Sequence, residues 1–349
     1  MTVEIVRRGE SHAEEIFRLY GDVFGQAPTD RSRERWRWQY LENPAVSTGG
    51  PAIWVAVENG TVLGQYASMP VRLQWGDREV DSSWGMDVFL RPEARGKGIG
   101  ALLFGAWSES VTVALGLGLT ESSYGLFKKL RYEDVGPVPF FQRILDAKAV
   151  AARKAGPWLG ALGPVAGAAL DLARPERAHP DAGSVAVTSI DAFSDEFDGL
   201  WERARASYAM CVRRDRAYLT WKYQQPPHRR YALHAARRDG ALVGYAVSRH
   251  EDYQGLRLGW LVDVFADSDD GAAKDALIGS VLDAFRAAGV ARVQAFCLNG
   301  ALAEDLGRRG FFEGRSPMQF CVRARGDATH VFADRERWHV VFGDSDMDR

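Results

Sequence analysis

The chain has 349 residues, of which 46% are hydrophobic and 26% are charged, a composition typical of a globular protein with a sizeable core and length enough for two domains. Its 44 lysine and arginine residues and 46 aspartate and glutamate residues leave a net charge of −2. This balance excludes the basic excess that generic nucleic-acid binding requires, so we expect no nucleic-acid partner.

Cysteine usage and the N-terminus indicate where the protein resides. The sequence has three cysteines, Cys211, Cys297 and Cys321, which are too sparse for a disulfide framework or a zinc site. The first residues lack the charged and then apolar stretch of a signal peptide. We therefore expect a cytoplasmic protein in a reducing environment.

The first 45 residues favour two helices. Apolar residues at helical spacing predict the first helix, with Ile16, Leu19, Tyr20 and Phe24 on one face. A second helix is predicted from about residue 31 to residue 42. Its arginines (Arg31, Arg33, Arg35 and Arg37) are interpreted mainly as a solvated basic face, with binding of an acidic ligand as the alternative.

The next 45 residues favour three strands. Apolar runs predict strands at 52–57 and 62–73, and Asn59-Gly60 between them is typical of a type I′ hairpin turn. A third strand is predicted, and residues 84–90 form its last part.

A glycine-rich turn, Arg95-Gly96-Lys97-Gly98-Ile99-Gly100, follows the third strand and opens a helix predicted at 101–115. Glycines allow backbone conformations with positive φ, and they let a ligand approach the backbone closely. The first turn of a helix has unpaired N–H groups and the positive end of the helix dipole. Strand, turn and helix together therefore predict an anion site, to which Arg95 and Lys97 add charge.

The spacing of these glycines matches neither the dinucleotide-binding fingerprint nor the P-loop. It resembles motif A of the GNAT (GCN5-related N-acetyltransferase) superfamily, through Arg95, Gly98 and Gly100. The resemblance implies that the turn binds the pyrophosphate of acetyl-CoA. The cofactor-binding residues that it implies are Val88, Phe89, Leu90, Arg95, Gly96, Lys97, Gly98, Ile99, Gly100 and Phe127.

The following segment extends this resemblance. A short apolar strand is predicted at 115–119, and 123–132 resembles GNAT motif B. A strand at 138–145 is expected to close the first sheet. The resulting order, β-α-α-β-β-β-α-β-α-β, is similar to the GNAT order, which implies an α/β fold with a mixed sheet. We assign residues 1–146 to a GNAT domain with an acetyl-CoA site.

Residues 147–184 are rich in alanine, glycine and proline and are interpreted as a helical linker. A membrane contact at 155–170 is the alternative. That run contains two prolines and is shorter than the roughly 20 residues of a membrane span, so we disfavour a membrane role.

The second half repeats the first. Four phrases recur in the same order, at offsets of about 180 residues. Trp38-Gln39-Tyr40 recurs as Trp221-Lys222-Tyr223, and Asn59-Gly60 recurs as Asp239-Gly240. Trp84 to Phe89 recurs as Trp260 to Phe265, and Lys128 to Glu133 recurs as Arg308 to Glu313. We therefore predict two tandem GNAT-like domains, the second of them degenerate and spanning 185–349.

The second copy lacks the glycine turn. At the corresponding place it has Asp267-Ser268-Asp269-Asp270-Gly271, in which three carboxylates would repel a pyrophosphate. We therefore expect CoA to bind the first domain alone.

The resemblance implies acyl transfer from acetyl-CoA to an amine, with a backbone N–H near Val88 or Phe89 stabilising the oxyanion. The family's acid is a tyrosine, but Phe127 stands at its position here and has no proton to donate. Tyr124, one helical turn earlier, is the substitute, against the alternative of a packing tyrosine. Asp87 and Glu121 are the candidate bases, against the alternatives of a structural aspartate and a solvated glutamate.

The C-terminal stretch ends in alternating aspartates, Asp344, Asp346 and Asp348. They are interpreted as an acidic, frayed terminus, with a calcium loop or contact with a cationic substrate in the first domain as alternatives. The seven histidines are not at metal-ligand spacing, so no metal is expected. Taken together, we predict an N-acetyltransferase that acts on a small-molecule amine, and a non-catalytic CoA-binding regulatory or scaffold protein is the alternative.

Overall fold

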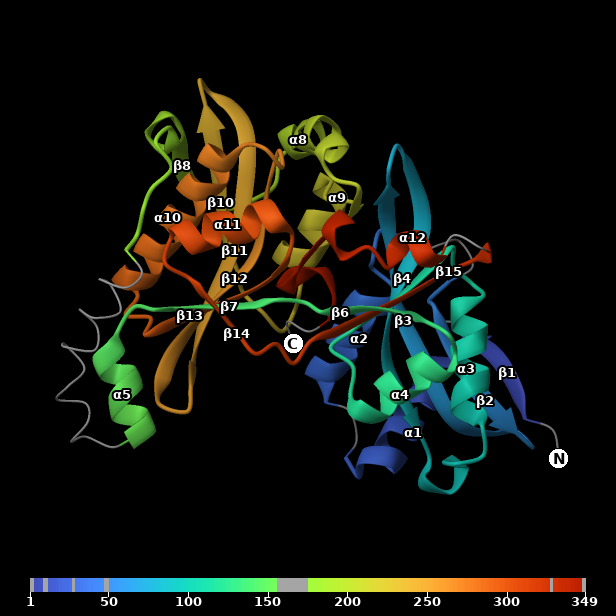
Figure 1. Cartoon of the computed structure of the whole chain (residues 1–349). Coiled ribbons are helices and arrows are strands. Elements are labelled where there is room, and N and C mark those ends of the chain that lie inside the picture. The colour runs from blue at the N-terminus through green and yellow to red at the C-terminus, as the bar shows by residue number, and fades with distance from the viewer. Residues whose placement is uncertain are drawn as a thin grey trace.

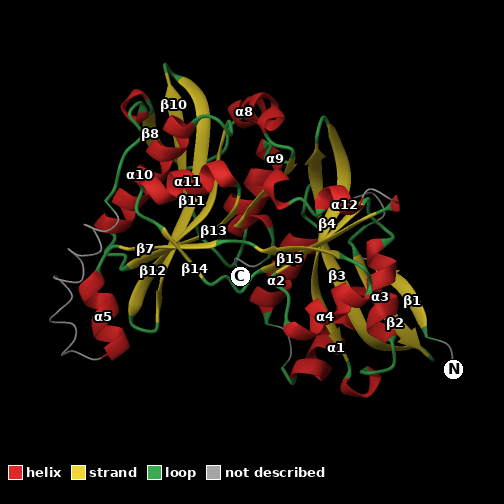
Figure 2. Ribbon diagram, viewed as in Figure 1, coloured by secondary structure: helices red, strands yellow, loops and turns green. Residues whose placement is uncertain are grey.

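The computed structural model describes residues 3–8, 12–26, 29–46, 50–155, 175–326 and 329–346. Its strands form one continuous, 16-stranded mixed sheet, which is bent into the two lobes seen in Figure 1. Helices flank the strands of both lobes (Figure 2). The predicted α/β fold with a mixed sheet is therefore confirmed.

The first half has the predicted order of elements with one strand added, because β6 precedes the strand predicted at 138–145. It comprises β1 (Glu4–Arg8), α1 (Ala13–Phe24), α2 (Asp30–Tyr40), β2 (Ile53–Glu58), β3 (Thr61–Trp75), β4 (Arg78–Leu90), α3 (Ile99–Ser108), β5 (Val113–Leu117), α4 (Glu121–Lys129), β6 (Glu133–Pro137) and β7 (Phe140–Ile144). The hairpin turn between β2 and β3 has positive φ at both Asn59 (51°) and Gly60 (76°), as a type I′ turn requires. The helix predicted at 101–115 is shorter, because it ends at Ser108.

The second half repeats this order with one added strand. After α5 (Ala147–Ala155) come β8 (Ala186–Ile190), α8 (Glu196–Ala204), β9 (Met210–Val212), α9 (Arg216–Leu219), β10 (Ala232–Arg238), β11 (Ala241–Tyr253), β12 (Leu256–Ala266), α10 (Gly271–Ala287), β13 (Arg292–Leu298), α11 (Gly300–Arg308), β14 (Phe312–Gly314) and β15 (Gln319–Ala324). The chain then adds α12 (Thr329–Phe332), β16 (Trp338–Val341) and the 3₁₀ turn η8 (Phe342–Asp344). The segment 155–170, for which a membrane contact is the disfavoured alternative, lies almost entirely outside the described residues.

Two residues that recur in the sequence repeat meet at the junction of the halves. The rings of Trp38 and Trp221 are stacked with their centroids 5.0 Å apart. The indole N–H of Trp38 donates to the carbonyl of Trp221 (2.8 Å), and the indole N–H of Trp221 donates to the carbonyl of Trp38 (2.9 Å). Such reciprocal contacts are typical of two similar bodies related by an approximate twofold axis.

The two halves exchange one strand each. The strand β7 pairs with β13 and β14 of the second half, whereas β15 lies between β5 and β6 of the first; both crossings are visible in Figure 1. The expectation that a strand at 138–145 closes the first sheet is therefore wrong. Any strand can supply the same backbone hydrogen bonds, so the sequence pattern does not specify the partner. The domain boundaries at 146 and 185 stay a prediction.

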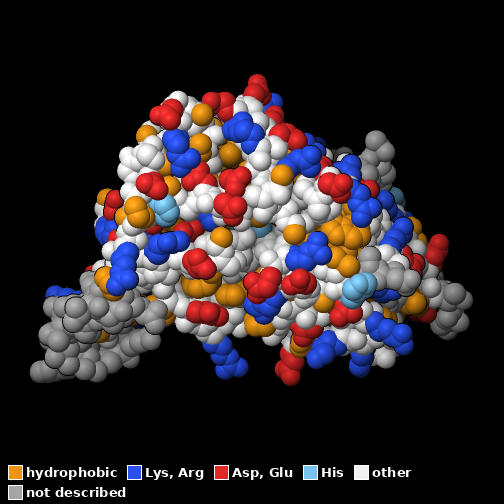
Figure 3. Space-filling model, turned by 45° about the horizontal axis from the view of Figure 1, so that its top comes forward, with side chains coloured by type: hydrophobic (Ala, Val, Ile, Leu, Met, Phe, Trp, Pro, Cys, Tyr) orange, Lys and Arg blue, Asp and Glu red, His pale blue; other side chains and the backbone are white. Residues whose placement is uncertain are grey.

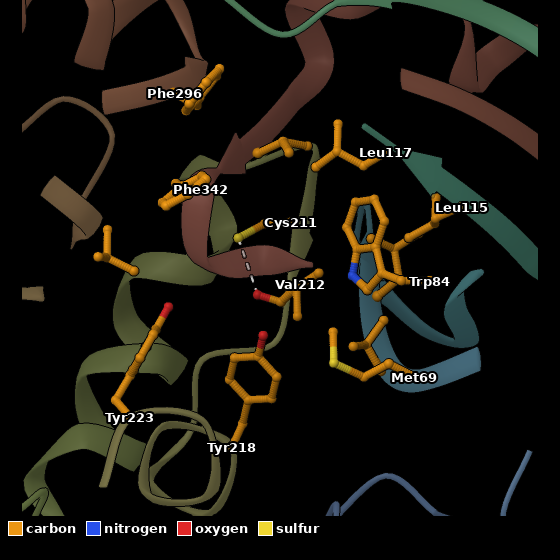
Figure 4. Close-up of a cluster of buried hydrophobic side chains, with 14 of the residues drawn as sticks. Met69, Trp84, Leu115, Leu117, Cys211, Val212, Tyr218, Tyr223, Phe296 and Phe342 are labelled. Atoms are coloured by element: carbon orange, nitrogen blue, oxygen red, sulfur yellow. Dashed lines mark hydrogen bonds between the residues drawn. The ribbon is translucent and has the colours of Figure 1, made fainter. Parts of the chain in front are cut away.

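The hydrophobic core is continuous across this junction. One cluster of buried side chains extends from Ile16 in α1 to Phe342 in η8. Figure 4 shows its central part, where Met69 and Trp84 of the first half face Val212 and Phe342 of the second. At the surface, acidic and basic side chains are interspersed on the face shown in Figure 3.

Candidate functional site

The predicted glycine turn lies between a short 3₁₀ turn, Pro92–Ala94, and α3. Gly96 and Gly98 have φ values of 76° and 80°, which a residue with a side chain rarely adopts. Gly98 is the N-cap residue of α3, and no side chain caps the helix there. The N–H groups of Ile99 and Gly100, the first two residues of the helix, therefore have no acceptor within the helix, whereas those of Ala101 and Leu102 donate to the carbonyl of Gly98.

The surroundings leave this turn open. Residues 95–98 are exposed, whereas the flanking Ala94 and Ile99 are buried and hold both ends of the turn in the core. The exposed segment contains the cations Arg95 and Lys97. Positive charge, free helix N–H groups and exposure together make this turn suitable for an anion such as a phosphate.

The strand β4 leads into the turn and diverges from its parallel neighbour β5. The two strands pair only from Ser82 to Trp84. Beyond Trp84, the register between β3 and β4 shifts, and Asp87 has a φ of 44°. This irregularity bends β4 away from β5, as a β-bulge does. Within the described part of the chain, β4 therefore does not pair with β5 beyond Trp84.

A cavity of about 930 Å³ occupies the gap between the diverging strands, a size suited to a cofactor together with a small substrate. Its lining includes Val88, Phe89, Leu90, Arg95 and Gly100 from the predicted cofactor residues. The sequence reasoning missed several other lining residues, because their spacing was typical of a helix face or a buried strand; they are Phe17, Ser32, Trp36, Gln39, Tyr40, Gln65, Leu117, Gly118 and Leu119.

Asp87 is the one predicted catalytic residue that lines this cavity. Its carboxylate accepts a hydrogen bond from the hydroxyl of Tyr40 (Oδ2, 2.6 Å), and Gln39 Nε2 lies 3.5 Å from the same oxygen. Gln65 Nε2 donates to the Asp87 carbonyl at 3.0 Å. Asp87 is therefore held in place from both α2 and β3, on the side of the cavity formed by the first two helices.

Tyr124 and Glu121 are not among the residues that line the cavity. The Tyr124 hydroxyl donates to Asp134. This hydrogen bond, together with slight burial and the nearby negative charge, raises the pKa of Tyr124 to about 12. Glu121 is exposed in the first turn of α4. Neither residue is thus part of the lining, although their neighbours Thr120, Ser122 and Ser123 are, and their catalytic roles stay a prediction.

Phe127 is part of the core, although it also contributes to the cavity lining. It is 1% exposed, and its ring contacts the rings of Phe104 and Tyr132. A Cβ on Gly116 would lie 2.3 Å from this ring, so β5 requires glycine at that position for Phe127 to fit. The position implied for the family's acid is thus filled by a packing side chain.

In the second half, the C-terminal segment lies at the place that corresponds to this opening. Past Leu261, where the pairing of β12 with β13 ends, the turn η8 lies against β12, and β16 pairs with the end of β13. Asp263, the counterpart of Asp87, accepts hydrogen bonds from Tyr223 (3.0 Å) and Tyr245 (2.8 Å).

Asp344 is 1% exposed, so the interpretation as a frayed acidic terminus is wrong for this residue, whereas Asp348 lies outside the described residues. Both of its carboxylate oxygens accept from Arg214 NH2, at 2.8 and 3.0 Å. The Arg214 Nε also lies 3.4 Å from Asp263. Burial raises the pKa of Asp344, and the charge of Arg214 opposes that rise. The buried ion pair fixes the C-terminal segment, since either charge alone would be costly to bury.

The acidic stretch that replaces the glycine turn has a structural use. Asp270 is the N-cap residue of α10, and its side chain accepts from the N–H of Ala273. It also forms a bidentate ion pair with Arg238 (2.8 and 2.9 Å). The side chain thus occupies the helix N-terminus that a phosphate would need, which supports the expectation that CoA does not bind here.

We predict that Asp270→Ala lowers the free energy of unfolding by about 1 to 2 kcal/mol, because it removes this cap. Burial disfavours the Asp270 carboxylate, but bonds from Arg238 and Ala273 outweigh burial and lower its pKa from 3.8. The stabilisation is therefore present above pH 3.8 and is lost as the pH falls further, so the difference from wild type should shrink there. Urea titrations across this range measure it. Asp269→Ala, at an exposed neighbour, is the control; an equal loss there would contradict the capping role.

The C-terminal segment continues from the ion pair to the cavity of the first half. Asp346 lines that cavity together with Arg35 of α2. Of the four arginines interpreted as a solvated face, Arg35 thus faces the cavity, whereas Arg33 pairs with Glu14 and Arg37 with Glu42. Within the described residues, no acidic, histidine or cysteine cluster could hold a metal, and no helix is long and apolar enough to cross a membrane.

Comparison with known families and structures identifies the first part of the chain. Residues 4–109 match the family model described as an acetyltransferase (GNAT) domain. This range contains the glycine turn and the bulge of β4. No curated protein matches the chain significantly.

Solved structures share the fold over nearly the whole chain. A GCN5-related N-acetyltransferase from Anabaena variabilis has a TM-score of 0.64 at 13% identity, covering 95% of this chain and 75% of that one. Eis1 from Mycobacterium abscessus has a TM-score of 0.55 at 16% identity, with coverage of 95% and 76%. N-myristoyltransferase from Saccharomyces cerevisiae, solved with myristoyl-CoA, has a TM-score of 0.53 at 12% identity, with coverage of 92% and 82%. At these identities the likeness concerns the fold alone.

Proposed function

This chain carries an acetyltransferase (GNAT) domain over residues 4–109, and on that premise we propose that it transfers the acetyl group of acetyl-CoA to a primary amine of a small molecule. The observation that carries the proposal is the uncapped, exposed glycine turn beside a cavity that opens between β4 and β5. An anion site next to a gap between two diverging strands suits a phosphate-bearing, amide-containing donor.

Acetyl-CoA fits the residues present. Its pyrophosphate would accept hydrogen bonds from the backbone N–H groups of residues 96–100, and Arg95 and Lys97 would add positive charge. Its pantetheine amides would pair with β4 at 88–90. In the second half, Asp270 and the C-terminal segment occupy the corresponding places, so we propose one CoA site in each chain.

The chemistry requires few side chains. The neutral amine attacks the thioester carbonyl carbon, a C–N bond forms, and the C–S bond breaks as CoA leaves as a thiolate. A backbone N–H near Val88 or Phe89 would stabilise the oxyanion. We propose that Asp87, which lines the cavity, takes the proton of the amine. A thiol has an ordinary pKa of about 8.5, so its thiolate can leave without the side-chain acid that Phe127 cannot supply.

Two measurements test this function. Calorimetry should show one acetyl-CoA site in each chain, and a thiol assay should show CoA release that depends on an added amine. Binding without release for any of a broad panel of amines would favour the alternative of a non-catalytic CoA-binding protein. Absence of CoA binding would reject both.

The double variant Arg95→Glu, Lys97→Glu is expected to raise the Kd for CoA about tenfold, because two cations at a helix N-terminus become anions. The effect should diminish as salt is added, and the melting temperature should barely change, since both side chains are exposed. Lys128→Glu, Lys129→Glu, at the exposed end of α4, is the control for net charge. Equal losses in the two double variants would place the phosphates elsewhere.

A further inference from the structure

Two exposed aromatic side chains, which core packing does not explain, cluster at the cavity with Phe89, a half-buried residue at the edge of the core. Tyr20 and Phe24 of α1 are 40% and 53% exposed, although their spacing predicts a buried face. Their rings lie 5.9 and 5.3 Å from the ring of Phe89 on β4, and 4.6 Å from each other. All three line the cavity. Large aromatic side chains left exposed together are typical of a binding surface.

The aromatic surface continues into the cavity. Phe17 and Trp36 also line it, with their rings in an edge-to-face contact at 5.4 Å. These two residues come from α1 and α2, and the cluster at Tyr20 lies one helical turn further along α1. The helical side of the cavity is therefore lined with rings.

Two carboxylates share the lining with these rings. Asp87 is held by Tyr40 of α2 at 2.6 Å. Asp346 arrives from the other half of the chain, where Lys222 Nζ donates to the adjacent carbonyl of Ser345 at 2.7 Å and Arg214 binds Asp344. Both anchors are buried side chains, with Lys222 4% and Arg214 1% exposed. The second half thus places a carboxylate in the cavity of the first.

The carboxylate of Asp87 and the aromatic rings on this side of the cavity suit a cation. Tyr40, which bonds to Asp87, is neutral, whereas Asp346 lies next to the cations Arg35 and Lys222. An ammonium group gains from carboxylates and also from the faces of aromatic rings. A sugar presents less apolar surface than an arylalkyl group, so it gains less from burial against these rings.

We propose that the acceptor is an arylalkyl primary amine, whose ring packs on Tyr20, Phe24 and Phe89 and whose ammonium is held by Asp87 and Asp346. This inference rests on the proposed function and names the substrate class of the same site. It narrows the small-molecule amine to an amphipathic cation and disfavours amino sugars.

The test compares 2-phenylethylamine with glucosamine as acceptors, using acetyl-CoA and the full chain. The value of kcat/KM for 2-phenylethylamine should be at least tenfold higher. The double variant Tyr20→Ala, Phe24→Ala should raise KM for 2-phenylethylamine about tenfold, since partial burial of a ring contributes about 1.4 kcal/mol or more. KM for acetyl-CoA should stay unchanged. Tyr253→Ala, which removes an equally exposed ring (51%) on the β11–β12 hairpin, is the matched control.

The role of Asp346 is tested with a neutral analogue of the same shape. Asp346→Asn should weaken the binding of 2-phenylethylamine about fivefold to tenfold, because one charge-assisted contact becomes neutral. The inhibition constant of 2-phenylethanol, which has no charge, should be the same for this variant as for the wild type. An equal loss for both compounds would assign Asp346 a structural role.

The outcomes separate this inference from the proposed function. Faster turnover of glucosamine, or equal effects of the aromatic double variant on both amines, would overturn the inference and leave the acetyltransferase function intact. If no amine released CoA, the function would fail. Calorimetry would then measure the affinity of 2-phenylethylamine for the CoA-loaded wild type and for the CoA-loaded Tyr20→Ala, Phe24→Ala variant. Equal affinities for the two proteins would overturn the inference.

Discussion

Replacing Gly98 with valine is expected to raise the Kd for acetyl-CoA by about 100-fold or more. Gly98 has a φ of 80° as the N-cap of α3, and a β-branched residue in that region costs on the order of 1–3 kcal/mol. The turn would relax, and its N–H groups would no longer converge on one anion. Losing two hydrogen bonds to a charged group costs about 3 kcal/mol, which corresponds to this change in Kd.

The turn is exposed, and a Cβ at Gly98 would meet no atom within 4 Å. The variant should therefore stay folded, with a melting temperature within a few degrees of wild type, so calorimetry reports on binding. The matched control is Gly105→Ala in the middle of α3, where a Cβ also meets nothing within 4 Å. Its Kd should be unchanged and its stability slightly higher, because alanine favours a helix. Wild-type affinity in the Gly98 variant would show that the phosphates bind elsewhere.

The isolated first half is expected not to fold. A fragment of residues 1–155 lacks β15, which in the full chain lies between β5 and β6. Without it, the fully buried strand Val113–Leu117 would expose apolar side chains and a row of unpaired backbone groups. The continuous core would also be cut at its centre. Circular dichroism and denaturant titration should show no cooperative transition for this fragment.

A full-length chain cut by a protease site inserted between residues 155 and 175 provides the contrast. Its two fragments should remain together as a 1:1 complex and bind CoA with the affinity of the uncut protein, because each fragment supplies a strand to the sheet of the other. The same insertion without protease controls for the insertion itself. A monomeric 1–155 fragment that unfolds cooperatively would contradict an essential strand exchange.

Local features of the site could be predicted from the sequence, because short-range chemistry fixes them. Asn59-Gly60 forms the hairpin since few other residues adopt positive φ. The glycines at 96 and 98 form an uncapped helix start for the same reason. The repeat of Trp38 as Trp221 predicts two similar halves, and the structure brings these two residues into reciprocal contact.

The residues that the sequence misplaced depend on distant neighbours. Tyr20 and Phe24 have the spacing of a core face, but hydrophobic periodicity does not distinguish a face against the sheet from one against a cavity. The role of Tyr124 as an acid stays a prediction; its hydroxyl donates to Asp134 of β6, a contact that its spacing did not indicate. Asp344 has the local sequence of a solvated tail, but it is buried against Arg214, 130 residues earlier.

The sequence by itself indicated most of the order of elements in the first half and the glycine turn, because both depend on dihedral preferences and spacing within a few residues. Only the tertiary structure decided which half β7 and β15 complete, which rings are left facing the cavity, and where the C-terminal carboxylates lie. Every strand offers the same backbone hydrogen-bonding groups, so these groups do not select the partner strand. A charged side chain is tolerated in the core only where an oppositely charged side chain lies beside it. Those choices therefore depend on contacts that form when the two halves come together.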